Sequence, residues 1–453
     1  MQRTYLSTTI TTYMIDTYRI RKLGGDKIAL LGILAVGLLT ARFVVALKSA
    51  IVLSEPIELA HAGLSLSMPA GNGWENETEW VYGENALTLS SDFALASGRP
   101  TARAYCRYLL APRRTTPQIW FTEKASQIDG SIVETGQTRT DTLTIDWAHI
   151  QKSEVLLTTF VGTVELPGNR QLDIEVREIT GDTDLAEFTF RHVVNSLDFE
   201  DNRLIEAGAE VVTQIKSKGL SSFLSNQNQQ TFFLIKDSRK RSVGYTMDVV
   251  VDSGKEDELN IEAAGLFYMR DRNTYEQVGS FESNNSFDIF VWKSETHSQT
   301  HRSRTEIILE EAGLMTVRRS DTAPPESSIY LGPTAIPDIF LDYVLRQMLD
   351  SSKTEIVVDM IGTDGKVTPA FISGIEKEND IAADDEAAYV LKLELLDGRG
   401  FSENIYLDDQ KQIYRRILRQ KDVYVAESAS MEDIMREFPE QAEYTLRKNR
   451  MLE

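Results

Sequence analysis

The chain has 453 residues and a formal net charge of −21 at pH 7. This length is enough for two or three domains with well-filled cores. The acidic balance argues against non-specific binding to nucleic acid or to an anionic membrane surface, and we expect no nucleic-acid partner. The single cysteine, Cys106, excludes an intrachain disulfide framework, and its strand-like neighbours predict a structural role rather than a nucleophile.

An apolar run over residues 28–47 follows a basic stretch near the start of the chain. About 20 mostly apolar helical residues cross a bilayer core, so this run predicts a transmembrane helix over residues 28–48. Basic residues beside a first membrane helix tend to stay in the cytoplasm, which places residues 1–27 inside the cell. The residues expected to form the anchor are Ile28, Leu31, Leu34, Leu38, Val44 and Leu47.

We interpret this run as the uncleaved signal anchor of a single-pass inner-membrane protein, with the later domains outside the cytoplasm. Two alternatives stay open. One is a cleaved secretory signal, which normally has a shorter basic region and a small-residue cleavage site. The other is a buried helix of a soluble domain.

The segment 57–200 has the pattern of an α/β domain. An alternating strand leads into a Pro/Gly turn and Trp74, a helical stretch covers residues 117–128, and an amphipathic helix closes the segment. The layout resembles the PsbP-like α/β sandwich, which has an antiparallel sheet. The matching residues are Gly63, Pro69, Gly71 to Trp74 and Ser196 to Phe199. This resemblance implies a binding or assembly module and supplies no catalytic residues.

A helical pattern over residues 201–217 is ended by Gly219 and followed by a polar stretch. It predicts a helical connector over residues 201–230 between two domains. After it, residues 231–440 alternate between apolar and polar positions in many strand-length runs, which predicts a large antiparallel sheet.

Two segments of this second domain share one local pattern. Residues 305–319 and residues 403–416 each consist of a strand, an acidic turn and a second strand, which predicts two hairpins. A helix is expected over Ile336–Leu349, with Pro337 in its first turn. Ser430 is expected to cap a final helix through Phe438, and residues 441–453 form a polar tail.

The Leu-Asp-Asp-x-x-x-Ile-x-Arg-Arg hairpin at residues 407–416 resembles the LolA/LppX type of lipoprotein carrier, a curved antiparallel sheet with a helix across its concave side. The resemblance implies that the helix over residues 336–349 lines or plugs an apolar groove that binds acyl chains. The residues expected to line this groove are Ile339, Phe340, Val344, Leu345 and Met348.

The sequence offers no catalytic or cofactor motif, and we expect no cofactor and no metal. His297 and His301 have the spacing of a helical metal pair, but the strand patterns around them predict a polar hairpin loop. Gly362–Lys366 resembles part of a nucleotide loop and is interpreted as a β-turn.

The overall prediction is an α+β protein with an N-terminal transmembrane helix, an α/β sandwich and a curved antiparallel sheet with a packed helix. Its predicted function is non-enzymatic: an envelope protein whose outer domains bind an apolar ligand, a lipid or lipoprotein acyl chain, or a partner protein. A structural or assembly subunit of a membrane complex is the alternative. A hydrolase that uses scattered carboxylates such as Asp359 and Glu394 is the third hypothesis.

Overall fold

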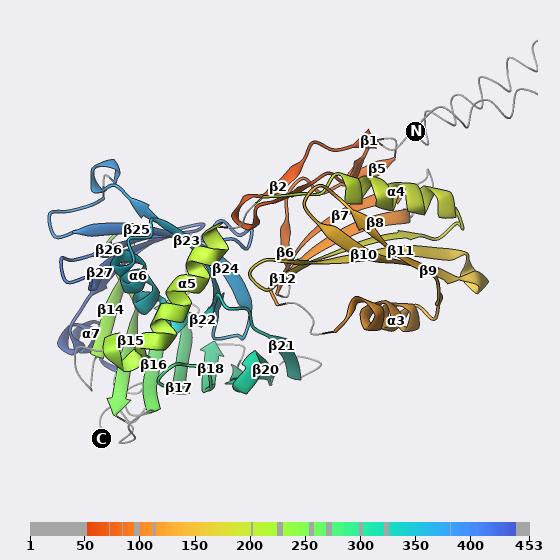
Figure 1. Cartoon of the computed structure of the whole chain (residues 1–453). Helices are drawn as coiled ribbons and strands as arrows, with labels where there is room; N and C mark the ends of the chain where they lie inside the picture. Colours follow the sequence, from red (N-terminus) through yellow and green to blue (C-terminus); the bar gives the residue numbers. More distant parts are fainter. Residues whose placement is uncertain are drawn as a thin grey trace, which may run out of the picture.

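The computed structural model describes residues 52–440, apart from residues 72, 84, 95–99, 112–114, 201–202, 224–229, 253–257, 269–273, 299–301, 321–325 and 381. Two domains lie side by side, one built by the chain up to residue 199 and the other by the chain from residue 203 onward (Figure 1). Strands make up most of both domains. The fold is therefore mostly β, and the expected α+β class is corrected.

The expected membrane helix finds no support. In the described ranges between residues 52 and 440, no helix is long and apolar enough to cross a membrane. The longest helix there, α5 (Arg203–Lys218), has 16 residues and buries only one of its faces. The membrane-anchored architecture and the inner-membrane location are corrected on this finding. The expected anchor over residues 28–48 lies outside the described residues, with Ile28, Leu31, Leu34, Leu38, Val44 and Leu47.

The N-terminal domain consists of short and long strands with two helices. The strands are β1 (Val52–Leu53), β2 (Ile57–Leu59), β3 (Leu64–Leu66), β4 (Pro69–Ala70), β5 (Trp74–Asn76), β6 (Val81–Gly83), β7 (Ala86–Ala94), β8 (Pro100–Leu109), β9 (Ser131–Arg139), β10 (Thr144–Lys152), β11 (Leu157–Leu166), β12 (Arg170–Glu178) and β13 (Asp198–Phe199). The helices are α3 (Pro117–Gln127) and α4 (Thr183–Asn195), with 3₁₀ turns η1 (Ala60–Ala62) and η2 (Ser153–Val155).

The main sheet of this domain carries a helix on each face. Its strand order is β5-β7-β8-β12-β11-β10-β9, with β6 beside β7. Helix α4 packs Phe190 against Phe160, with ring centroids 5.8 Å apart. Helix α3 packs Trp120 on the opposite face, against the neighbouring Val161. Successive strand residues point to opposite faces, so Phe160 and Val161 belong to two different cores.

The C-terminal domain begins with α5 and continues almost entirely in strands. These are β14 (Gln230–Asp237), β15 (Ser242–Asp252), β16 (Glu258–Tyr268), β17 (Thr274–Asn284), β18 (Phe290–Ser298), β19 (Arg302–Leu309), β20 (Leu314–Arg319), β21 (Glu326–Tyr330), β22 (Ala335–Pro337), β23 (Glu355–Ile361), β24 (Val367–Ile375), β25 (Tyr389–Leu395), β26 (Ser402–Leu407), β27 (Ile413–Arg419) and β28 (Val423–Ser428). The other elements are α6 (Leu341–Asp350), α7 (Met431–Glu437), η3 (Leu220–Phe223), η4 (Glu311–Gly313), η5 (Asp338–Phe340) and η6 (Lys377–Asn379).

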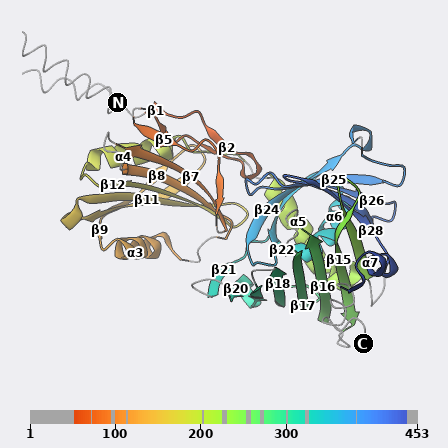
Figure 2. The same ribbon diagram turned by 180° about the vertical axis from the view of Figure 1, so that it is seen from behind.

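These strands form one sheet of 15 strands, in the order β21-β20-β19-β18-β17-β16-β15-β14-β28-β27-β26-β25-β24-β23-β22. Neighbours are antiparallel except β22 and β23, which pair in parallel. The sheet curves around α5 and α6, which lie against its concave side (Figures 1 and 2). Helix α7 packs on the outer side, where Ile434 and Phe438 meet Phe232 and Leu234 of β14.

Helix α5 is part of the core of the C-terminal domain, although the sequence predicts a connector in this region. It packs on β23 and α6, and Val211, Val212 and Ile215 are fully buried. Gly208 allows this close packing, because a Cβ at this position would stand only 1.9 Å from the carbonyl oxygen of Val357. Helix α5 is therefore the first element of the second domain and part of its core.

Helix α6 starts later than the sequence predicts. Pro337 ends strand β22 instead of starting the helix, because its ψ of 138° is extended and it pairs with Ile361. The α-helix begins at Leu341, after the 3₁₀ turn η5. The last helix is confirmed with its predicted cap: Ser430 accepts a hydrogen bond from the backbone N–H of Asp433 at 3.1 Å, and the two form a capping box.

The two domains are joined by a buried ion pair. Arg170, at the start of β12, lies 2.6 Å from Asp359 of β23 (Nη2 to Oδ2), and both side chains are 1% exposed. Arg170 also donates to the carbonyl of Leu110 at 2.7 Å and to Thr334 Oγ1 at 3.1 Å. Thr334 in turn donates to Asp359 at 2.6 Å. This network fixes the first domain to the second.

Replacing Arg170 by Met should destabilise the protein strongly, because Asp359 would remain buried without its charge partner. We expect a loss of about 3–5 kcal/mol in the free energy of unfolding, measured by denaturant titration. Arg103→Met is the matched control, because Arg103 and Asp92 form an exposed pair with an expected effect under about 1 kcal/mol. Equal effects of the two substitutions would contradict the role of the buried pair.

Candidate functional site

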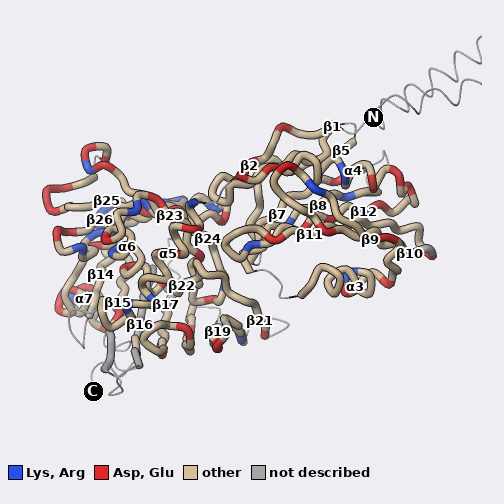
Figure 3. Tube along the Cα trace, in the orientation of Figure 1, with Lys and Arg blue, Asp and Glu red and all other residues tan. Residues whose placement is uncertain are grey.

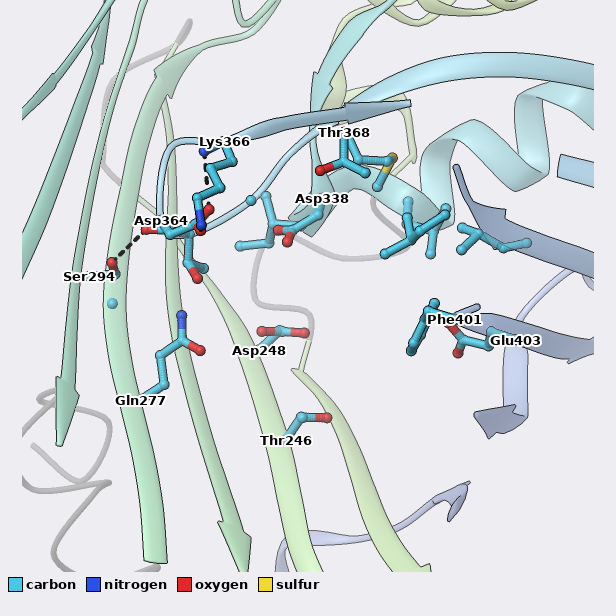
Figure 4. A pocket seen from close by; sticks show the side chains of 18 of the residues that line it. Thr246, Asp248, Gln277, Ser294, Asp338, Asp364, Lys366, Thr368, Phe401 and Glu403 are labelled. Carbon is cyan, nitrogen blue, oxygen red and sulfur yellow. Dashed lines mark hydrogen bonds and ion pairs between the residues drawn. The ribbon is translucent and has the colours of Figure 1, made fainter. Parts of the chain in front are cut away.

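The curved sheet of the C-terminal domain surrounds a partly open cavity of about 530 Å³. Both halves of the sheet and the η5–α6 segment contribute to its wall, as Figure 4 shows for several side chains. The apolar part of the wall is formed by Phe233, Ile261, Trp292, Ile339, Leu341, Tyr343, Met360, Leu393, Leu395 and Phe401. The cavity is therefore a space inside the domain that its helices do not fill.

Strand alternation determines which residues face the cavity. On β14, Phe232 and Leu234 pack under α7, so the intervening Phe233 points to the concave side. On β15, Tyr245 and Met247 belong to the same outer cluster, and Thr246 and Asp248 face inward. A polar stripe of the sheet thus lines the cavity.

Six acidic side chains line this space, and four of them come from four different helices and strands. Asp248 comes from β15, Asp338 from η5, Asp342 from α6 and Glu403 from β26. The guanidinium of Arg416, on β27, lies 2.5 Å from Glu403 (Nε to Oε1), and Glu403 is almost fully buried. The half-buried Arg416 is therefore paired with one of these four acids.

The surrounding protein keeps these carboxyls from ionising easily. Desolvation, together with the charge of Asp342, raises the pKa of Asp248 to about 7, against the attraction of Arg416. Desolvation and the charges of Asp248 and Asp364 raise the pKa of Asp338 to about 7. Burial also raises the pKa of Asp342 and that of Glu403. Asp248 and Asp338 are therefore partly protonated near neutral pH.

The rim of the cavity includes the turn between β23 and β24 and one residue of the other domain. The turn closes with a hydrogen bond from the N–H of Gly365 to the carbonyl of Gly362 at 2.8 Å, which confirms the predicted β-turn. Tyr82 of the N-terminal domain donates from its hydroxyl to the carbonyl of Val367 at 2.5 Å. The first domain therefore helps to hold the rim of the cavity.

The helix expected to line an apolar groove contributes differently from the prediction. Ile339 lines the cavity. Phe340 packs edge-on against Phe281, with ring centroids 5.1 Å apart, and so belongs to the core. The η5–α6 segment presents Asp338 and Asp342 to the cavity, while most of its apolar residues pack elsewhere. The remaining predicted groove residues, which the structure places fully buried in the core, are Val344, Leu345 and Met348.

Sequence reasoning missed the carboxyl groups of the cavity. Asp248 lies in an alternating strand whose polar positions are typical of a sheet face in contact with solvent. The only signal in the sequence for inward-facing carboxyls was the resemblance to a lipoprotein carrier. That resemblance implies a curved sheet, and a curved sheet has one face directed toward the interior of the domain. Asp338 and Asp342 have the spacing of one helical turn, and polar residues at this spacing are typical of the solvent-facing side of an amphipathic helix.

Other residues singled out in the sequence have structural roles. Cys106 is fully buried on β8, and burial raises the pKa of its thiol to about 12. His297 lies on β18, 2.7 Å from Glu295. Asp359 forms the buried pair with Arg170, and Glu394 pairs with Lys392 at 2.7 Å. Across the residues that the structure describes, no group of three or more His, Cys, Asp and Glu could hold a metal ion.

A groove of about 1040 Å³ lies between the two domains. It shares Leu395 and Phe401 with the wall of the cavity. The ring nitrogens His61 Nε2 and Trp80 Nε1 are buried there without a hydrogen-bond partner. Burial, together with the charge of Arg170, lowers the pKa of His61 to about 4, so its ring is neutral.

Comparison with solved structures finds distant likenesses. A β-barrel-like protein of the domain of unknown function DUF1849 from Brucella abortus aligns with 45% of this chain and 96% of its own, at 10% identity and a TM-score of 0.34. A DUF1089 family protein from Pseudomonas aeruginosa aligns with 37% and 86%, at 10% identity and a TM-score of 0.22. A protein from Bacteroides thetaiotaomicron aligns with 37% and 60%, at 13% identity and a TM-score of 0.20.

No protein-family model matches the sequence, and no curated protein does. Likenesses at these TM-scores assign no function to the chain. The β-rich character of the protein is shown by its own strands, and the specific PsbP-like and LolA-like resemblances are not shown.

The charge state of the cavity predicts a pH-dependent stability. The folded state keeps the proton of Asp248 up to about pH 7, whereas the unfolded chain releases it near pH 4, so stability falls as the pH rises through this window. Asp248→Asn removes the ionisable group and therefore this loss of stability at high pH. We expect its melting temperature to exceed that of the wild type by more at about pH 8 than at about pH 5.

Scanning calorimetry of both proteins across this range measures the difference. Asp409→Asn, at an exposed position, is the matched control and should show no such trend. A gain for Asp248→Asn that is independent of pH would contradict the elevated pKa of Asp248.

Proposed function

We propose that the C-terminal domain is a non-enzymatic binding domain that holds a small molecule with an apolar body, such as an acyl chain, in its cavity. The observation that carries this proposal is the cavity itself, which stays unfilled although α5 and α6 pack into the same concave side. Its volume of about 530 Å³ lies within the roughly 300–1,000 Å³ typical of small-molecule sites.

The wall of the cavity supports an apolar body for the ligand. Trp292 and Phe233 approach from β18 and β14, Leu393 from β25 and Phe401 from the loop before β26. Apolar surface that leaves water on binding contributes about 25 cal/mol per Å². A ligand of mainly apolar surface therefore gains affinity from this part of the wall.

The cavity is also fixed in shape before a ligand arrives. Phe340 stacks on Tyr343 with ring centroids 5.4 Å apart, and packs edge-on against Phe281 at 5.1 Å. These contacts hold the start of α6 against β17. A pre-formed site loses less conformational entropy on binding, which favours affinity for a small molecule.

Filling the cavity should abolish this binding. Thr246 points into it from β15 (Figure 4), and Thr246→Trp places a large ring in the ligand space. We expect the full-length wild type to bind the neutral apolar dye Nile red with increased fluorescence, and Thr246→Trp to bind it at least about tenfold more weakly. The control is Thr135→Trp, on exposed strand β9 of the other domain.

Fluorescence titration and circular dichroism test this prediction together. A folded Thr246→Trp protein that binds the dye as tightly as the wild type would contradict the proposed site. A wild type that binds no dye would contradict the proposed function.

A further inference from the structure

We propose that the ligand of this cavity carries a positive charge, as an organic amine or guanidinium attached to an apolar body, and that Asp248, Asp338 and Asp342 receive this charge. The inference rests on the proposed function, because it names the chemical class of the molecule that the cavity binds.

The charges that line the cavity are unbalanced. Six acidic side chains and three basic ones form part of its wall. Each basic group already has an acidic partner. The three pairs are Lys366 with Asp364 at 3.1 Å, Arg399 with Asp397 at 3.4 Å and Arg416 with Glu403 at 2.5 Å. Among the described residues, Asp248, Asp338 and Asp342 therefore remain without an ion-pair partner, and the cations that act on Asp342 from a distance are Arg416 and Arg346.

These three carboxyls share one region of the cavity. Asp338 and Asp342 stand one turn apart on the η5–α6 segment, and Asp248 faces the same space from β15, as Figure 4 shows for Asp248 and Asp338. None of the three forms an ion pair with a side chain in the described part of the chain. The surface that they retain faces the cavity, which is where a bound cation would lie.

The neighbours of these acids suit an organic cation. Thr246 and Gln277 place polar groups on the same side of the cavity as Asp248 (Figure 4). Aromatic rings of Trp292, Tyr343 and Phe401 complete the wall, and such rings attract ammonium and guanidinium groups within about 6 Å. One end of the cavity therefore attracts positive charge, and the apolar wall accepts the rest of the molecule.

A metal ion fits this arrangement less well than an organic cation. Metal sites gather three or more ligand atoms within about 2–2.6 Å of one point. Among the described residues no group of His, Cys, Asp and Glu is placed for that, including the three carboxyls of the cavity. An amine on a flexible body can contact acids that are spread over a wider space.

A cation among these acids would also change their protonation. The charges that face Asp248 are Asp342 and Arg416, and those that face Asp338 are Asp248, Asp364 and Arg416. Both carboxyls are partly protonated near pH 7, since burial and like charges raise the pKa of each. A bound ammonium favours their ionised form, so binding should release protons.

The test compares three molecules with one apolar body: octylamine, octanol and octanoate. Their affinities for the full-length protein are measured by isothermal titration calorimetry at about pH 7, where the amine is charged. We expect octylamine to bind at least about tenfold more tightly than octanol, and octanoate to bind most weakly. Titration in buffers of different ionisation enthalpy should show proton release with octylamine only.

Variants separate charge recognition from general binding. Asp248→Asn combined with Asp338→Asn should lower octylamine affinity about tenfold or more and should change octanol affinity much less, because octanol carries no charge. Asp409→Asn should change none of them. Circular dichroism shows whether the double variant is folded.

The outcomes distinguish the two proposals. Equal affinity for octylamine and octanol, or an equal effect of the double variant on both, would overturn the cationic ligand while the binding function stands. Failure of Nile red and all three octyl compounds to bind would overturn the binding function itself.

Discussion

The C-terminal domain depends on one constraint: a curved sheet of 15 strands directs every second side chain toward a shared concave space, and that space has to be occupied. Helices α5 and α6 occupy much of it with apolar residues, and Gly208 lets α5 approach the backbone of β23 closely. The part that they leave free is the cavity. The positions of the helices, the core and the candidate site therefore follow from the curvature.

The acidic side chains inside the cavity are a second consequence of the curvature of the sheet. Asp248 would be an ordinary surface residue on a flat sheet with one face in water. On the concave face it meets Asp338 and Asp342 in the cavity, where Glu403 pairs with the nearby cation, Arg416. Neighbouring carboxyls that repel one another in the free protein, and whose repulsion a bound group would reduce, are typical of functional sites. Acidic residues elsewhere are spread along both domains, as Figure 3 shows.

Local patterns in the sequence predicted local structure well. The capping box at Ser430, helix α3 from Pro117 and the hairpins β19–β20 and β26–β27 are all present, because short-range hydrogen bonds and turn geometry determine them. The buried position of Cys106 followed from its strand pattern in the same way. These features need only neighbouring residues.

Long-range features could not be read from the sequence. The pair between Arg170 and Asp359 joins residues far apart in the chain, and nothing near either residue signals its partner. The sequence pattern showed the apolar face of α6 but not what this face packs against. Phe340 packs into the core, and Asp338, a polar residue close to Phe340, faces the cavity. The membrane anchor was inferred from an apolar run alone, and no helix in the described ranges supports it.

The central claim is that the cavity holds carboxyls without cation partners, and the pKa of Asp248 tests it most directly. Carbon-13 NMR of carboxyl-labelled aspartate, assigned by comparison with Asp248→Asn, gives this value in the free protein. The structure predicts a pKa of about 7 for Asp248, far above the usual value of about 4 for aspartate. A measured pKa at or below about 4 would show that the carboxyl is already compensated, and would contradict the account of the cavity.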